Sequence, residues 1–268
     1  MSDYKSKYGQ YALITGASSG IGEAFAYKLA SLNLNLVLIA RREERLKKIK
    51  EEIELKYSVN VVSLSLDLTK ENFIEEVKEK TENLEIGILI NNAGFGSTGD
   101  YTDIDADHEE KMIKLNCLAP YILTHHFVKQ MKERRKGAII FLGSVVSLIS
   151  VPYMSTYSAT KAFNTILADG LWYELKKYNI DVLSLNPGGT ETEFQRLSKV
   201  SGGPFVRKPE DVVKTALKAL GKKAAVVDGL MNKLNIFLSR LLPRKFVLNI
   251  SGKVSQEILK AGSYENKR

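Results

Sequence analysis

A tyrosine and a lysine one helical turn apart are the side chains of this sequence best placed to do chemistry. Tyr157 and Lys161 lie four residues apart in Tyr-Ser-Ala-Thr-Lys, so a helix puts them on one face. A free phenol has a pKa of about 10, and lowering it to about 7 requires about 4 kcal/mol of preference for the phenolate. A nearby ammonium attracts a phenolate, more strongly where water is excluded. The pair therefore predicts proton transfer, although on an arbitrary helix the same spacing is usually a surface feature.

A glycine-rich turn near the N-terminus predicts a site for a phosphate group. Residues 15–22 read Thr-Gly-Ala-Ser-Ser-Gly-Ile-Gly and connect a strand-like run to a helix-like run. Glycines allow the tight turn and bring backbone N–H groups close to a pyrophosphate, while the helix N-terminus adds partial positive charge. The position between strand and helix, more than the glycines alone, favours a dinucleotide site.

The elements that must position these residues alternate between apolar, β-rich runs and amphipathic helical runs. Nearly continuous apolar strands are typical of a parallel sheet covered on both faces. No Pro/Ser-rich linker or repeat divides the 268 residues, so we predict an α/β fold: a single doubly wound Rossmann domain with about seven parallel strands and helices on both faces. The expected strands are Tyr11–Thr15, Leu34–Ala40, Val59–Leu66, Ile86–Asn91, Ala138–Leu142, Val182–Asn186 and Ala224–Val227, and the expected helices are Gly20–Ser31, Arg42–Tyr57, Lys70–Glu82, Asp107–Arg135 and Ser155–Tyr178.

Several motifs in a fixed order carry a family resemblance. The first turn has the spacing Gly-x-x-x-Gly-x-Gly, and the later helix has Tyr-x-x-x-Lys. With these, the chain resembles the short-chain dehydrogenase/reductase family from about residue 11 to residue 194. One departure is Gly87, where the family usually has an Asp that supports the adenine pocket. The other matching positions are Asn91-Asn92-Ala93-Gly94, Asn116, Ser144, Pro187-Gly188 and Thr192.

The resemblance implies a hydride-transferring enzyme with four catalytic side chains. Tyr157 would be the acid/base, and Lys161 would lower its pKa and contact the nicotinamide ribose. Ser144 would hydrogen-bond the substrate oxygen as charge develops there, and Asn116 would hold a water that links Lys161 to solvent. The expected cofactor contacts are Gly16, Ser18, Ser19, Gly20, Ile21, Gly22, Arg41, Arg42, Asp67, Leu68, Asn92, Ala93, Gly94, Tyr157, Lys161, Pro187, Gly188, Thr190 and Thr192.

Two arginines at the end of the second strand predict the form of the cofactor. An NAD enzyme has a carboxylate here for the ribose 2′-hydroxyl, but no Asp or Glu occurs along this strand. A planar guanidinium suits phosphate oxygens. We therefore predict NADP(H), with Arg41 as the main contact and Arg42 or Ser18 assisting; the alternative is two solvated residues at a helix start. Asp67 could contact the adenine and also cap the next helix.

The positive charge is concentrated at the C-terminal end. Residues 199–268 carry 15 Lys/Arg and 5 Asp/Glu, against 24 and 26 in the rest of the chain. Such a segment suits an anionic ligand or membrane face, or is simply a solvated surface. The basic residues are not interleaved with aromatics, so we predict no nucleic-acid partner. The three histidines and Cys117 lack metal-ligand spacing, so we predict no metal site, and the lone cysteine and polar N-terminus indicate the cytoplasm.

The substrate side is predicted at residues 189–208, where Phe194, Leu197 and Phe205 could line a pocket. The arginine pair and the run Pro-Gly-Gly-Thr-Glu-Thr-Glu-Phe are similar to ketoacyl- or hydroxysteroid-type reductases of bacteria, which implies a small apolar carbonyl or alcohol substrate. Residues 228–268 form a basic amphipathic extension. Its leucine stripe favours packing on a subunit or over the pocket, with weak contact to a membrane surface as the alternative.

The main prediction is thus an NADP(H)-dependent oxidoreductase of carbonyl and alcohol groups, built as one domain over residues 1–268 and assembled as a homodimer or homotetramer. One rival is a dinucleotide-binding sensor without catalysis. The other is a membrane-surface reductase of lipid or acyl carbonyls. The intact set of Asn116, Ser144, Tyr157 and Lys161 argues against the sensor.

Overall fold

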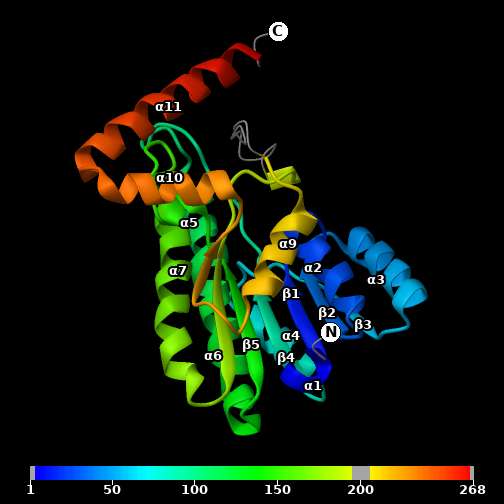
Figure 1. The fold of residues 1–268 in the computed structure, drawn as a ribbon. Coiled ribbons are helices and arrows are strands. Elements are labelled where there is room, and N and C mark those ends of the chain that lie inside the picture. The colour runs from blue at the N-terminus through cyan, green and yellow to red at the C-terminus, as the bar shows by residue number, and fades with distance from the viewer. Residues whose placement is uncertain (1–3, 195–205, 266–268) are drawn as a thin grey trace.

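Seven parallel strands form one sheet in the computed structural model, which describes residues 4–194 and 206–265 (Figure 1). Their order is β3-β2-β1-β4-β5-β6-β7, so the chain reverses direction across the sheet between β1 and β4. This confirms the predicted doubly wound sheet. The strands are β1 (Tyr11–Thr15), β2 (Asn35–Ala40), β3 (Val61–Ser65), β4 (Ile86–Asn91), β5 (Gly137–Leu142), β6 (Ile180–Asn186) and β7 (Ala225–Val227).

Alternating side chains along the strands divide the interior into two hydrophobic cores. Ala12 and Ile14 of β1 belong to the core with α2, α3 and α9, whereas Leu13 belongs to the core with α4, α6 and α7. Because both faces are covered, most strands are nearly continuous apolar runs, as the sequence predicted. The helices of these layers are α2 (Gly20–Ala30), α3 (Glu43–Tyr57), α4 (Phe73–Thr81), α6 (Ala119–Arg134), α7 (Ser155–Lys176) and α9 (Pro209–Ala219).

The predicted continuous helix over Asp107–Arg135 is wrong in one important respect. The segment consists of α5 (Ala106–Ile113), a π-helical turn η1 (Lys114–Leu118) and α6. The apolar periodicity of an α-helix does not reveal one inserted wider turn, and such turns are frequent at functional sites. Asn116 lies in this turn.

A short N-terminal helix absent from the sequence prediction, α1 (Tyr4–Tyr8), packs at the end of the sheet opposite α10 and α11 (Figure 1). Tyr8 is buried, and its hydroxyl donates a hydrogen bond to Asp181 Oδ2 at 2.8 Å. A Cβ at Gly87 would collide with the Tyr8 carbonyl oxygen and lie 2.6 Å from Gly9 Cα. Glycine at position 87 therefore leaves room for the end of α1.

Replacing Gly87 with Ala is expected to destabilise the protein by about 1–3 kcal/mol, the usual cost of overpacking. The matched control is Gly170→Ala in α7, where the new Cβ would meet only Glu174 Oε1 at 4.0 Å. That change should stabilise by about 0.5–1 kcal/mol, since alanine is the better helix former. Urea unfolding followed by circular dichroism measures both. Equal stability of Gly87→Ala and wild type would show that α1 does not pack here.

The C-terminal extension forms two helices, α10 (Leu230–Leu241) and α11 (Arg244–Glu265), which lie across the carboxyl end of the sheet (Figure 1). The predicted leucine stripe is on α10, and Pro243 separates it from α11. Asp228 anchors the start of the extension, because its buried carboxylate accepts hydrogen bonds from Arg207 Nε at 3.1 Å and Thr215 Oγ1 at 2.6 Å. Within the described residues, no helix is long and apolar enough to cross a bilayer.

Candidate active site

The glycine turn connects β1 to α2 at the carboxyl end of the sheet. Gly16 and Gly20 have positive φ values of 66° and 59°, which favour glycine. A Cβ at Gly22 would collide with the Gly16 carbonyl and lie 2.5 Å from Asn92 Nδ2. The turn can therefore be as tight as it is only with glycine at these positions, and its backbone stays open to a ligand.

The end of β4 is tied to the end of β1 by Thr15. The Thr15 hydroxyl accepts hydrogen bonds from the backbone N–H groups of Asn92 at 3.0 Å and Ala93 at 2.9 Å. The Asn92 amide donates to the Thr15 carbonyl at 2.8 Å. These bonds fix the Asn-Asn-Ala-Gly segment beside the glycine turn, where the sheet order reverses and ligands of this fold class bind.

A groove of about 1020 Å³ runs along this end of the sheet. It is lined by the glycine turn, the end of β2, the Asn-Asn-Ala-Gly segment and the start of α7, and its size and glycine-rich floor suit a dinucleotide. Gly22 packs beneath the turn, and Asn116 is fully buried. The other predicted site residues line the groove: Gly16, Ser18, Ser19, Gly20, Ile21, Arg41, Arg42, Asp67, Leu68, Asn92, Ala93, Gly94, Ser144, Tyr157, Lys161, Pro187, Gly188, Thr190 and Thr192.

Tyr157 and Lys161 lie on the same buried face of α7, with exposures of 6% and 5%. The Lys161 ammonium is 5.8 Å from the centre of the Tyr157 ring and donates a hydrogen bond to the Leu142 carbonyl at 2.9 Å. Burial lowers the pKa of Lys161 to about 8. The lysine is thus a desolvated cation held between the end of β5 and the phenol.

The Tyr157 hydroxyl and Ser144 share one end of the groove. Burial raises the pKa of Tyr157 well above its usual range, and a hydrogen bond with Ser144 acts in the opposite direction. The sequence predicted that Lys161 lowers the pKa of Tyr157. In the structure, desolvation of the phenol is the largest effect and raises that pKa. Ser144 is fixed at the end of β5, since its hydroxyl accepts a hydrogen bond from Val146 N at 3.3 Å.

Asn116 connects the π-helical turn η1 to the loop after β4 and to α7 through hydrogen bonds. Its side-chain amide donates to the Phe95 carbonyl at 2.9 Å and to Thr160 Oγ1 at 3.0 Å, and its side-chain oxygen accepts from Phe95 N at 3.2 Å. Asn164 donates to the Asn116 backbone carbonyl at 2.8 Å. The side chain therefore positions the loop after β4 against α7, a role that the sequence did not predict.

Arg42, more than Arg41, is bound to the glycine turn. Its Nη2 donates to Ser18 Oγ at 3.0 Å and Ser19 Oγ at 2.7 Å. The same guanidinium forms an ion pair with Glu193 at 2.5 Å. Sequence reasoning missed Glu193, because 151 residues separate it from Arg42.

Asp67 does not cap a helix beginning at Lys70, because α4 begins at Phe73. Instead its carboxylate accepts hydrogen bonds from the backbone N–H of Thr69 at 3.0 Å and from the Thr69 hydroxyl at 2.8 Å. Burial alone would raise the pKa of Asp67, but these bonds and the Arg41 charge leave it below its usual range. The charged side chain lies in the groove lining, where the sequence placed the adenine.

Apolar side chains form a cluster around the ring of Tyr157. Phe194 lies against the phenol ring, with centroids 5.5 Å apart. Two backbone hydrogen bonds join the chain just before Phe194 to Arg207. Arg207 N donates to the Gly189 carbonyl and Glu191 N donates to the Arg207 carbonyl, both at 2.9 Å. Predicted lining residues Leu197 and Phe205 lie outside the described residues. The cluster consists of Met112, Met154 and Tyr157 with Phe95, Val146, Val151 and Phe194.

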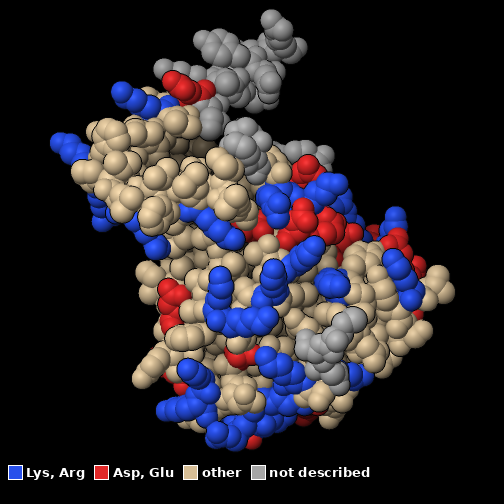
Figure 2. All heavy atoms as spheres, in the orientation of Figure 1, with Lys and Arg blue, Asp and Glu red and all other residues tan. Residues whose placement is uncertain are grey.

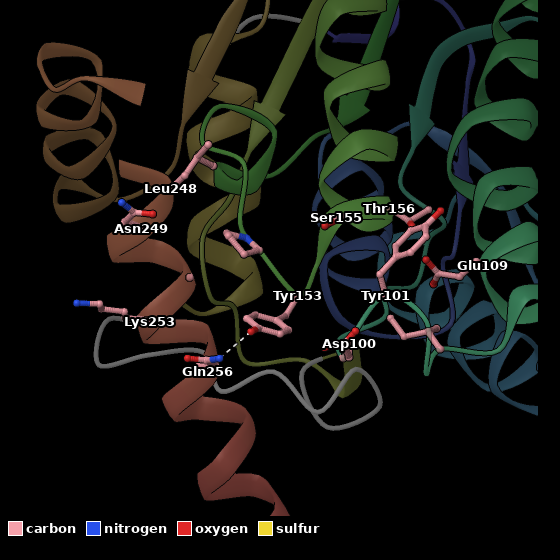
Figure 3. A pocket seen from close by; sticks show the side chains of 14 residues that line it. Asp100, Tyr101, Glu109, Tyr153, Ser155, Thr156, Leu248, Asn249, Lys253 and Gln256 are labelled. Atoms are coloured by element: carbon pink, nitrogen blue, oxygen red, sulfur yellow. Dashed lines mark hydrogen bonds between the residues drawn. The ribbon is translucent and has the colours of Figure 1, made fainter. Parts of the chain in front are cut away.

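A second cavity of about 700 Å³ lies between α11 and the segment that precedes Tyr157 (Figure 3). Tyr153 and Ser155 line this cavity, whereas Met154 between them lines the groove. The Tyr153 hydroxyl accepts a hydrogen bond from Gln256 of α11 at 2.8 Å. The C-terminal extension thus contacts the loop that leads into the site.

Comparisons with known proteins agree with this geometry. The family model of short chain dehydrogenases matches residues 10–200. The chain belongs to the short-chain dehydrogenase family. A 7beta-hydroxysteroid dehydrogenase from Clostridium sardiniense is 31% identical to it over 94% of this chain and 98% of the relative. A very-long-chain 3-oxoacyl-CoA reductase from Mus musculus is 30% identical over 95% of this chain and 83% of the relative.

Solved structures show the same likeness over most of the chain. A 7beta-hydroxysteroid dehydrogenase structure covers 93% of this chain and 99% of its own, with a TM-score of 0.87 at 29% identity. A short-chain dehydrogenase from Sphingobium yanoikuyae in complex with NADPH has a TM-score of 0.78 at 32% identity, over 87% of this chain and 94% of its own. This short-chain dehydrogenase is therefore an oxidoreductase that interconverts alcohol and carbonyl groups.

Proposed function

We propose that this short-chain dehydrogenase uses NADP(H) to reduce a carbonyl on a bulky apolar body, or to oxidise the corresponding alcohol. The observation that carries the choice of cofactor is the arginine pair at the end of β2, of which Arg42 is bound to Ser18 at the rim of the groove. A guanidinium beside a hydroxyl suits a 2′-phosphate. Steady-state kinetics with both cofactors test this: kcat/KM should be at least about 100-fold higher with NADPH than with NADH, the value of one or two charge-assisted hydrogen bonds.

The proposed mechanism assigns one task to each buried side chain. Bound NADP(H) supplies or accepts the hydride. In reduction Tyr157 donates its phenolic proton to the carbonyl oxygen, which Ser144 also hydrogen-bonds, and in oxidation the phenolate takes the proton back. Lys161 stabilises the phenolate by its charge, and Asn116 holds the loop after β4 against α7.

The two reaction directions should respond oppositely to pH. The phenol of Tyr157 stays protonated across neutral pH because burial raises its pKa, so kcat/KM for reduction should be flat from pH 6 to 8. Oxidation requires the phenolate, whose fraction grows about tenfold for each pH unit below that pKa. Its kcat/KM should therefore rise with pH and bend above about 8, where Lys161 loses its proton. An oxidation rate that falls between pH 6 and 8 would remove Tyr157 as the base.

The apolar cluster supports a substrate with a large hydrocarbon body. Phe95, Met154 and Phe194 offer no charge to a ligand near Tyr157, and residues 189–208 are proposed to cover that ligand. The relatives named above act on a hydroxysteroid and on a very-long-chain 3-oxoacyl-CoA, both with extended apolar portions. A screen of small polar aldehydes, alicyclic ketones, oxo-steroids and long-chain oxoacyl thioesters, followed at the NADPH absorbance, should give turnover with the bulky classes.

We propose that the protein is a homodimer or homotetramer in the cytoplasm. Large apolar side chains stay exposed along η1, α6 and α7, among them Tyr121 at 48%, Ile166 at 71% and Tyr173 at 77%. Exposed apolar side chains of this size suit contact with a second copy of the chain. Light scattering coupled to size-exclusion chromatography should give twice or four times the 29.9 kDa chain mass.

The extension over residues 228–268 is proposed to make weak contact with an anionic membrane surface. Ile236 is the buried side chain of α10, while Leu230, Phe237 and Leu241 are 61–79% exposed in the single chain, so this stripe is available to a second subunit, the favoured prediction, or to a membrane surface, its alternative. Figure 2 shows a largely uncharged surface over α10 and α11 with Lys and Arg at its margins. This pattern is typical of helices that lie on membranes. Co-sedimentation with vesicles that contain phosphatidylglycerol, weakened by salt, is the expected result.

A further inference from the structure

A carboxylate from the segment after β6 is bound to two arginines at the beginning of α3, beside the glycine turn. Glu193 Oε2 accepts a hydrogen bond from Arg42 Nη1 at 2.5 Å, and Glu193 Oε1 accepts one from Arg45 Nη1 at 2.7 Å. Arg42 is at the same time bound to Ser18 and Ser19 of the glycine turn. One guanidinium therefore joins the phosphate-binding turn to the segment that leads to the substrate side.

The neighbouring residue shows that this contact crosses the groove. A Cβ at Gly20 would lie 2.7 Å from Thr192 Cγ2, so Thr192 rests directly on the glycine turn. Glu193 and Arg42 both line the groove. Three successive residues thus contact three parts of the site: Thr192 the glycine turn, Glu193 the beginning of α3, and Phe194 the apolar cluster.

The Glu193 carboxylate is bound as an anion. Its hydrogen bonds to Arg42 and then Arg45 lower the pKa of Glu193 to about 2, so it is charged at neutral pH. Two guanidinium groups around one carboxylate also form the arrangement that binds phosphate oxygens. Glu193 therefore has the charge and the partners that a 2′-phosphate would have at Arg42.

We propose that Glu193 is a specificity-determining residue that competes with the cofactor 2′-phosphate for Arg42. This inference rests on the proposed use of NADP(H). A cofactor with the 2′-phosphate has to displace the carboxylate from Arg42, and two anions close together repel. A cofactor without it leaves the Glu193–Arg42 pair in place. Glu193 thus weakens the binding of NADPH and leaves that of NADH unchanged.

The test measures binding rather than turnover. The Kd values of NADPH and NADH come from cofactor fluorescence, and the Kd of 2′,5′-ADP comes from calorimetry, for wild type and Glu193→Gln. Glutamine keeps the shape of the side chain and removes its charge. The matched control is Glu191→Gln, two residues away, because Glu191 is exposed and bonds to Arg207 through its backbone.

Glu193→Gln should bind NADPH and 2′,5′-ADP about 3- to 10-fold more tightly, a gain typical of releasing one or two partly exposed ion pairs. The gain should shrink in high salt, NADH should change by less than about twofold, and Glu191→Gln should behave as wild type. Equal weakening of both cofactors would assign Glu193 a merely structural role, and unchanged Kd values would also overturn the proposal. If the wild type prefers NADH, the proposed use of NADP(H) is wrong, but the change in the Kd of 2′,5′-ADP still tests the role of Glu193. If neither the wild type nor Glu193→Gln binds 2′,5′-ADP, both the proposed cofactor and the proposed role of Glu193 are wrong.

Discussion

Replacing Tyr157 with Phe is expected to lower kcat by about 10²- to 10⁴-fold, the usual contribution of a positioned acid/base. The change removes the proton donor and keeps the ring that packs against Phe194. Cofactor affinity should stay within about twofold of wild type. Single-turnover kinetics, combined with a fluorescence titration of NADPH, separate the chemical step from binding.

Tyr153→Phe is the matched control for this loss. Tyr153 lies four residues earlier and lines the second cavity, where its hydroxyl bonds to Gln256 (Figure 3). Loss of one partly exposed hydrogen bond there should leave kcat within a few-fold of wild type. Wild-type turnover in Tyr157→Phe would exclude the phenol as the acid/base and would require another proton donor in the groove.

The second large effect is expected from removal of both arginines at the end of β2. The double variant Arg41→Ala/Arg42→Ala should raise the Kd of NADPH by at least about 100-fold, because a desolvated 2′-phosphate then loses its charged partners. NADH binding should change by less than about threefold. Isothermal calorimetry with both cofactors gives the two values directly.

Lys47→Ala/Lys48→Ala removes the same number of positive charges from the exposed side of α3 and is the matched control. These lysines pair with Glu43, Glu44 and Glu52 and stay away from the groove. Their loss should leave the ratio of NADPH to NADH affinity unchanged. An equal loss of NADPH affinity in both double variants would reduce the role of the arginines to net charge.

The elements that build the sheet were predictable because their signals are local. Each buried strand is a short apolar run, and the helices that follow carry one apolar face, so element type and order followed from the sequence. The π-helical turn at Asn116 was not predictable, since one extra residue in a turn hardly disturbs that periodicity. The helix α1 was missed because its five residues are held by Asp181 and by the space at Gly87, which lie far along the chain.

In the candidate site, too, local features were predictable from the sequence and long-range contacts were not. The glycine turn, Ser144, Tyr157 and Lys161 stand at positions set by element ends, and all of them line the groove. The Lys161 bond to the Leu142 carbonyl and the pairing of Glu193 with Arg42 are long-range contacts that spacing does not encode. The raised pKa of Tyr157 likewise depends on burial, which becomes known only once the chain is folded.

On the proposed mechanism, this chain transfers a hydride from NADPH to a carbonyl carbon whose oxygen is protonated by Tyr157. The most direct measurement uses NADPH with both hydrogens at nicotinamide C4 replaced by deuterium, together with a bulky apolar ketone and mass spectrometry of the alcohol. We predict one deuterium on the carbinol carbon, and about 10²- to 10⁴-fold slower formation of this deuterated alcohol by the Tyr157→Phe variant at equal cofactor occupancy. An alcohol formed without deuterium at that carbon would contradict direct hydride transfer and, with it, the function proposed for this site.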